Sequence, residues 1–308
     1  AHVVVWALDS ELYTLVVLAG VAVVGVVAGV LARGPAARTG AAAAATVATG
    51  GLAIASALSA GFRLEVAAFA AIAVAALSAL TAAGLARQAE GRVALGVEVP
   101  GWWLAGVGLI MAVSDARLVS LALACSGVLA LAVALRPDRR PAAWAGLGLL
   151  QFALWLQLAI SNVTAPEAYT ASLSVAGLIA AWLARRRDPG VSSWVGYGTA
   201  LALTFLPSAY AAWNDPGLAR PLLLGVAAFA ATLAGAWARL QAPLILGGAV
   251  LVVTAAHEFA PTLAELMGEG PRWLPIALAG AFLLFTGATY EHRLRDLRKI
   301  RRLIVRMR

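Results

Sequence analysis

The sequence contains a single cysteine, Cys125, and only three histidines. One cysteine cannot form an intrachain disulfide, and a cysteine-based metal cluster needs several thiolates. These shortages exclude a disulfide scaffold and a cysteine metal centre, and we expect neither a metal nor a cofactor. Cys125 lies within an apolar run, where a small packing role is expected.

Charge is also scarce. Only 12% of the residues are charged and 62% are hydrophobic, whereas ordinary soluble domains are about one-quarter charged. Long apolar runs recur along the chain, and about 20 such residues are enough to cross the hydrocarbon core as a helix. The composition therefore predicts an all-α polytopic membrane protein.

Charge, proline and glycine clusters bound eleven predicted spans. They cover residues 12–32, 40–61, 66–86, 97–113, 118–135, 142–160, 167–184, 194–212, 221–238, 242–259 and 273–290. The fourth is the least regular, because Trp102 and Trp103 near its Pro100 are also typical of an interfacial half-helix.

The basic residues divide unequally between the two sides of this arrangement. Four of the 23 basic residues fall on one side, and the other 19 fall on the opposite side. The four are Arg63, Arg117, Arg220 and Arg272. Because cytoplasmic loops are enriched in Lys and Arg, we expect a bacterial inner-membrane protein with a cytoplasmic C-terminus. The net charge of +8 is then explained by the basic cytoplasmic loops, and no nucleic-acid partner is expected.

Two short phrases occur twice. "SELYT" at 10–14 and "PEAYT" at 166–170 each precede an apolar run, and "VAAFAA" stands at both 66–71 and 226–231. A spacing of 156 to 160 residues predicts two parallel six-helix repeats, the first lacking its leading helix. We therefore expect a helix remnant at 1–8, repeats at 9–160 and 161–290, and a tail at 291–308.

Several phrases in the second half resemble a known group of proteins. They are SSW at 192–194, LPS at 206–208, LLLG at 222–225, RLQAP at 239–243, RW at 272–273 and GATYEHRLRDLR at 287–298. They look like the C-terminal domain of very large, multi-spanning actinobacterial membrane proteins of unassigned activity. This resemblance implies that the chain is the tail of a longer protein, and it implies no catalytic residues.

Polar residues inside or beside the spans are the candidate site residues. Candidates for a substrate or lipid site are Gln151, Gln157, Thr204, Pro207 and Ser208, and candidates at the outer surface are Glu167, Tyr169, His257 and Glu258. Each has a structural alternative, such as hydrogen bonding between helices or a place in the interfacial belt. The pair at 257–258 lacks the second histidine of a zinc-binding helix.

The tail has apolar residues at spacings of three or four with basic residues between them. This pattern predicts a basic amphipathic helix, which either lies on anionic lipid or only fixes orientation. Candidates for lipid head-group contacts are Arg298, Lys299, Arg301 and Arg302.

Three functions remain open at this point. The first is a non-catalytic membrane module of a larger assembly, packing against lipids, partner subunits or other segments of the same longer protein. The second is a transporter or lipid flippase with a site between the repeats. The third is an enzyme with an outer-surface site. This function requires an outer cleft that brings His257 and Glu258 together with Glu167 or Asp115.

Overall fold

A computed structural model describes residues 11–268 except 89, 189 and 216, with side chains up to Pro261. Every regular element in this part of the chain is a helix. The elements are α2 (Glu11–Leu31), α3 (Pro35–Ser59), α4 (Leu64–Arg87), α5 (Gly91–Met111), α6 (Ala116–Ala134), η1 (Pro137–Arg139), α7 (Ala142–Ile160), α8 (Pro166–Arg187), η2 (Trp194–Gly198), α9 (Thr199–Trp213), α10 (Ala219–Ala238) and α11 (Gln241–Gly268).

Nine helices in the described ranges are long and apolar enough to cross a membrane. They correspond to nine of the predicted spans, which indicates a multi-pass membrane protein. The predicted fourth span is one continuous helix, α5, with Pro100 inside it, rather than a half-helix. The predicted span at 273–290 and the basic tail lie outside the described residues.

The predicted eighth span has a different local structure from the others. Residues Trp194–Gly198 form a π-helical turn, and α9 continues from Thr199 for 15 residues. The turn holds two glycines, Gly196 and Gly198, which lower the cost of departing from regular α geometry. Ser193 directly precedes this turn in the chain and is almost fully buried. Its hydroxyl accepts a hydrogen bond from the backbone N–H of Ala242 at 3.3 Å.

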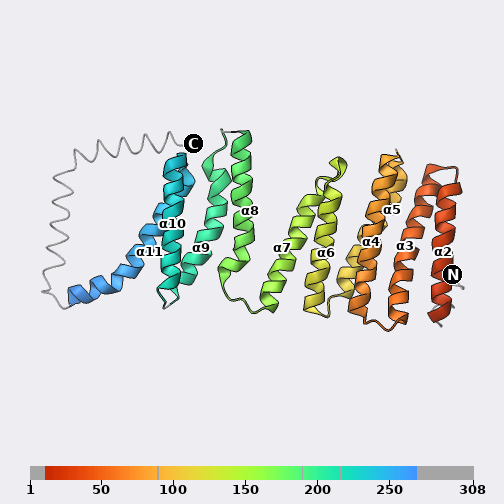
Figure 1. The fold of residues 1–308 in the computed structure, drawn as a ribbon, viewed down its shortest axis with the longest axis horizontal. Helices are drawn as coiled ribbons and strands as arrows, with labels where there is room; N and C mark the ends of the chain where they lie inside the picture. The colour runs from red at the N-terminus through yellow and green to blue at the C-terminus, as the bar shows by residue number, and fades with distance from the viewer. Residues whose placement is uncertain (1–10, 89, 189, 216, 269–308) are drawn as a thin grey trace. The chain divides into compact units, whose positions relative to one another are not determined.

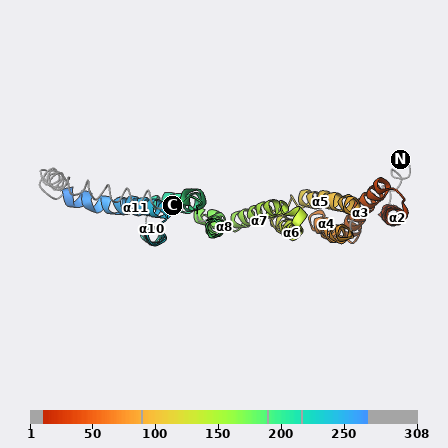
Figure 2. The ribbon, with the colours of Figure 1, turned by 90° about the horizontal axis from the view of Figure 1, so that it is seen from above.

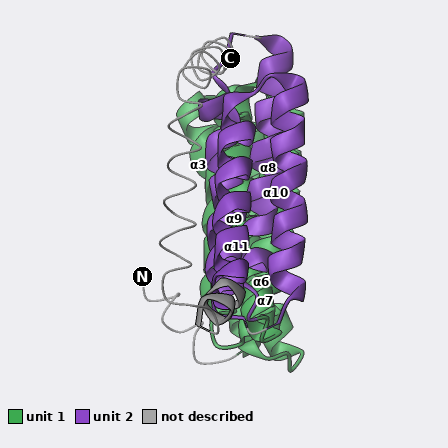
Figure 3. Ribbon diagram, turned by 90° about the vertical axis from the view of Figure 1, so that its left-hand side faces the viewer, with its two compact units in different colours: residues 1–163 green, residues 164–308 purple. Residues whose placement is uncertain are grey.

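The chain divides into two compact units, Ala1–Val163 and Thr164–Arg308 (Figure 3). In the first unit, α3, α4 and α5 all contact one another, as the view from above shows (Figure 2). Helix α2 packs on α3, and α6 contacts α4, α5 and α7. In the second unit, α9, α10 and α11 all contact one another, and α8 packs on α9.

Small residues allow the backbones to approach closely in both units. A Cβ atom added at Gly108 of α5 would lie 2.8 Å from the Ala68 carbonyl oxygen of α4. A Cβ atom added at Gly247 of α11 would lie 2.7 Å from the Ala228 carbonyl oxygen of α10. Both alanines are fully buried. Helix association in lipid relies on such van der Waals contact, since lipid chains are as apolar as the helices.

Turn residues set the ends of the helices. Gly61, between α3 and α4, has a φ of +84°, which glycine adopts without a steric cost. Asp115 caps α6, because its carboxylate accepts from the backbone N–H groups of Arg117 at 2.9 Å and Leu118 at 3.3 Å. Helix α10 ends at Arg239, which takes the left-handed conformation with a φ of 55°.

Candidate functional site

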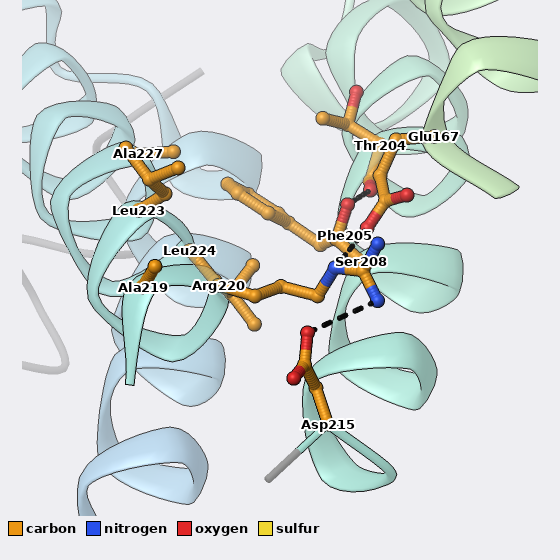
Figure 4. A pocket seen from close by; sticks show the side chains of 10 residues that line it. All are labelled: Glu167, Thr204, Phe205, Ser208, Asp215, Ala219, Arg220, Leu223, Leu224 and Ala227. Carbon is orange, nitrogen blue, oxygen red and sulfur yellow. Dashed lines mark hydrogen bonds and ion pairs between the residues drawn. The ribbon is translucent and has the colours of Figure 1, made fainter. Parts of the chain in front are cut away.

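The second unit contains a pocket with a volume of about 420 Å³. It lies where α8 and α10 begin and α9 approaches its end. Its apolar wall comes from α9 and α10, and its polar groups gather at one end (Figure 4). The lining residues are Glu167, Thr204, Phe205, Ser208, Asp215, Ala219, Arg220, Leu223, Leu224 and Ala227. A mostly apolar pocket of this size with a few convergent polar groups is typical of a ligand site.

One arginine links two carboxylates in this pocket. Arg220 extends from α10, and its Nε lies 3.4 Å from Glu167 Oε1 of α8 (Figure 4). Its Nη1 lies 3.5 Å from Oδ2 of Asp215, which precedes α10. Both distances exceed the roughly 2.7–2.9 Å of a tight charge-assisted hydrogen bond. The three side chains, each about one-third exposed, carry a net formal charge of −1.

The second carboxylate oxygen of Glu167 is buried, and no hydrogen bond reaches it from the described part of the chain. A buried carboxylate oxygen without a donor loses the hydrogen bonds that water would supply. Glu167 therefore carries an acceptor oxygen that the described residues leave unused, and its burial keeps this oxygen away from the open volume of the pocket.

The two hydroxyl groups of the pocket donate to their own helix. Thr204 Oγ1 donates to the Ala200 carbonyl at 2.9 Å, and Ser208 Oγ donates to the Thr204 carbonyl at 2.9 Å. This bonding is the structural role expected for hydroxyls next to Pro207, which interrupts the backbone ladder of α9. Because each hydroxyl hydrogen is used in this way, the oxygens offer the pocket lone pairs only.

A second pocket, of about 490 Å³, lies within the first unit. It contains Gln157, which the sequence indicates as a site residue, together with Arg117. Its Ser120 hydroxyl donates to the Ala153 carbonyl at 2.9 Å and so ties α6 to α7. Of the predicted site residues, Glu167, Thr204 and Ser208 line the pocket of the second unit, and Gln157 lines the pocket of the first.

An ion-pair cluster joins α5 to the connection between α6 and α7. Glu98 of α5 is only 4% exposed, and its Oε2 accepts from Arg136 Nη1 at 3.1 Å and from Arg139 Nη2 at 3.3 Å. Arg139 Nε also lies 2.9 Å from Glu98 Oε1. Asp138, 2.9 Å from Arg136, balances the second positive charge. Both oxygens of Glu98 therefore lie close to an arginine, whereas Oε2 of Glu167 receives no hydrogen bond from the described residues.

The remaining predicted residues lie apart from the Glu167 pocket. The ring of His257 packs against Trp213 with centroids 4.8 Å apart, and neither His257 nor Glu258 lines the pocket. Asp115 acts as the cap of α6. Tyr169 and Gln151 do not line either pocket, and Arg298, Lys299, Arg301 and Arg302 lie outside the described residues.

Sequence reasoning missed Arg220 and Asp215 as site residues. It treated Arg220 only as one of the few basic residues on the poorly charged side. A signal was present, because the predicted topology puts Arg220, Asp215 and Glu167 on that same side. Opposite charges at one end of a helix bundle are free to pair, although sequence alone does not say which ones do.

The described part of the chain contains no group of three or more His, Cys, Asp or Glu side chains arranged to hold a metal ion. Comparisons with protein-family models, with curated proteins and with solved structures found no match to this chain.

Proposed function

We propose that the chain is a non-catalytic integral membrane module of a larger assembly, which packs against lipids and against partner membrane segments. The uncovered apolar surface of α2 within the first unit is the observation that carries this proposal. In α2, Gly25 is the one residue that the described part of the chain buries, whereas α4 has eight buried residues. Val24 of α2 is 67% exposed.

Such a surface requires an apolar environment on most sides of α2. Lipid chains and apolar helices of a partner both satisfy this requirement. The resemblance to the C-terminal domain of very large actinobacterial membrane proteins favours other membrane segments of the same longer protein as partners.

Bilayer photolabelling tests the proposal. A lipid-soluble photoreactive probe is activated in native membranes and in nanodiscs that hold the purified chain, and labelled peptides are identified by mass spectrometry. We expect strong labelling of α2 in nanodiscs and weak labelling of α4 and α5. A helix labelled in nanodiscs and protected in native membranes is covered by a partner. Equal labelling of α2 and α4 in nanodiscs would contradict the proposal.

The proposal includes two parallel repeats. The contacts of α3 with α2, α4 and α5 have counterparts in the contacts of α9 with α8, α10 and α11. The repeated "VAAFAA" phrase puts Ala68 and Ala228 at the same place in the phrase, and both carbonyls face a glycine of the following helix. The division of the chain after Val163 also falls close to the predicted repeat boundary at 160. These features support duplication of one helical unit.

The proposal also includes a bacterial inner-membrane location with a cytoplasmic C-terminus. Successive helices of the first unit alternate in direction, so the α2–α3, α4–α5 and α6–α7 connections lie at one end of it (Figure 1). That end holds most arginines of the unit, namely Arg33, Arg38, Arg87, Arg92, Arg136, Arg139 and Arg140. This charge bias supports a cytoplasmic position for that end.

A transporter or lipid flippase is the second candidate, and the Glu167 pocket is the observation that favours it. A pocket open beside apolar helix surfaces can hold a lipid head group during transfer between leaflets. Reconstitution in vesicles with a fluorescent lipid in one leaflet tests this function. Lipid transfer that the chain accelerates, and that a block of the pocket abolishes, would favour the flippase over the module.

A further inference from the structure

We propose that the pocket formed by α8, α9 and α10 binds a primary ammonium group carried on apolar chains, as in a lipid with an ethanolamine head group. This inference deepens the proposed function, on which it rests for the lipid environment of the pocket. It assigns a ligand class to Glu167, with Thr204 and Ser208 as further acceptors.

The polar end of the pocket carries an excess of negative charge. The two carboxylates of Glu167 and Asp215 exceed the single guanidinium of Arg220, so the polar end of the pocket attracts a cation. Arg220 contacts the two acids at 3.4 and 3.5 Å and forms a tight pair with neither. An added cation therefore finds negative charge that one arginine leaves uncompensated.

The Glu167 carboxylate and the two hydroxyl groups of the pocket can accept hydrogen bonds and cannot donate them. This property favours a primary ammonium over cations that lack N–H donors. The Glu167 carboxylate lies 3.4 Å from Arg220, which is longer than a tight hydrogen bond. Thr204 and Ser208 have already donated their hydroxyl hydrogens to backbone carbonyls. These groups can only accept. A primary ammonium has three N–H donors, whereas a trimethylammonium of the same charge has none.

The shape of the pocket supplies a further argument. Beyond the charged end, the wall consists of Phe205, Leu223, Leu224 and Ala227 (Figure 4). Leu223 is mostly exposed, so this wall continues onto the apolar surface of α10. A charged head group with an acyl chain can therefore place the head at Glu167 and the chain along α10.

Native mass spectrometry of the full chain in detergent micelles tests the proposal with two lipids of identical acyl chains. Phosphatidylethanolamine and phosphatidylcholine share a phosphate and a positive charge, and only the first has N–H donors. We expect phosphatidylethanolamine to bind about tenfold more tightly, since a hydrogen bond to a charged group accounts for at least that factor. Dodecylammonium should displace it, and dodecyltrimethylammonium should not.

Two substitutions should have different effects on the preference for phosphatidylethanolamine over phosphatidylcholine. Glu167→Gln removes the acceptor charge and should erase the preference between the two lipids. Arg220→Gln removes the competing cation and should keep or strengthen the preference. Glu11→Gln is the matched control, because Glu11 stands in the corresponding phrase at the start of α2, and it should change nothing.

A second pair of variants keeps the test decisive if Glu167→Gln does not fold. Ala227→Phe fills the apolar wall without altering any charge and should block binding, whereas Ala230→Phe lies on the same helix outside the pocket and should not. Equal binding of both lipids to the unaltered chain would overturn the proposal. So would tight binding of anionic phosphatidylglycerol that Arg220→Gln abolishes, because the pocket would then be an anion site.

Failure of this inference is distinguishable from failure of the proposed function. The photolabelling of α2 does not depend on Glu167. Loss of lipid preference with unchanged photolabelling therefore rejects the pocket assignment and leaves the membrane module in place.

Discussion

Arg136 Nη1 lies 3.1 Å from Glu98 Oε2, although the two residues stand 38 positions apart in the sequence. Glu98 is buried within α5, and the connection after α6 brings two arginines to it. This contact fixes α5 to the α6–α7 connection at the arginine-rich end of the first unit.

Removal of the Glu98 charge should destabilise the first unit. Loss of one partner from a buried ion pair costs about 3–5 kcal/mol, and the partial exposure of the arginines reduces this to about 1–3 kcal/mol for Glu98→Gln. The free energy of unfolding in mixed micelles measures the change. Glu90→Gln is the control, because the Glu90 pair with Arg38 is about one-third exposed and should contribute less than about 1 kcal/mol. Equal losses in the two variants would contradict a special role for burial.

Gly108→Ala should force α4 and α5 apart. The new Cβ atom would meet the Ala68 carbonyl oxygen at 2.8 Å, and backbone cannot move aside as a flexible side chain can. We expect a loss of about 1–3 kcal/mol in unfolding free energy, as for overpacked cores. Gly106→Ala in the same helix meets nothing within 4 Å and should be neutral or slightly stabilising. A neutral Gly108→Ala would show that the helices separate at no cost.

The second unit allows the same comparison between adjacent positions. Gly247→Ala places a Cβ atom 2.7 Å from the Ala228 carbonyl, while Gly248→Ala meets nothing within 4 Å. Thermal unfolding monitored by circular dichroism should show a lowered midpoint for Gly247→Ala alone. Matching losses at 108 and 247 would support duplication of one packing unit, and a loss at only one of them would weaken it.

The end of α10 offers a stabilising change. Arg239 has a φ of 55°, which costs a side-chain-bearing residue about 1 kcal/mol and costs glycine nothing. Arg239→Gly should therefore raise the unfolding free energy of the second unit by up to about 1 kcal/mol relative to Arg239→Ala. The two variants lose the same charge, so their difference isolates the backbone term. A more stable alanine variant would be inconsistent with the left-handed cap.

Thiol accessibility tests the proposed orientation. Cys125→Ser provides a background without thiols, to which either Gly34→Cys or Phe62→Cys is added. These positions lie in the connections at opposite ends of α3. A membrane-impermeant reagent applied to intact cells should label position 62 and spare position 34. Labelling of position 34 alone would reverse the orientation.

The sequence predicted the long helices well because membrane spans are set by local composition. The predicted span at 142–160 agrees with α7 at both ends, since Pro141 and the polar residues after Ile160 bound it. Helix α11 was predicted to end at 259, yet it continues through Pro261 to Gly268. A proline removes one backbone hydrogen bond, and the rest of the helix can continue past it.

The candidate site was predictable only in part, because it depends on contacts between distant segments. Thr204 and Ser208 were predicted as polar residues within a span and Glu167 as a residue of the outer surface, and the pocket brings the three together. Their assembly with Arg220 depends on how α10 packs beside α9, which apolar periodicity does not specify. The π-helical turn at Trp194–Gly198 likewise has no periodic signal, since it departs from the α-helix over only five residues.

The Glu98 cluster has a consequence for the synthesis of the chain. Glu98 leaves the ribosome 38 residues before Arg136 and 41 before Arg139. While α5 enters the translocon, its carboxylate therefore lacks the two partners that compensate it in the folded unit, and we expect α5 to integrate fully only after α6 and the following connection have emerged. A chain truncated after Met111 should show less complete integration in microsomes than one truncated after Arg140, and Glu98→Leu should remove that difference.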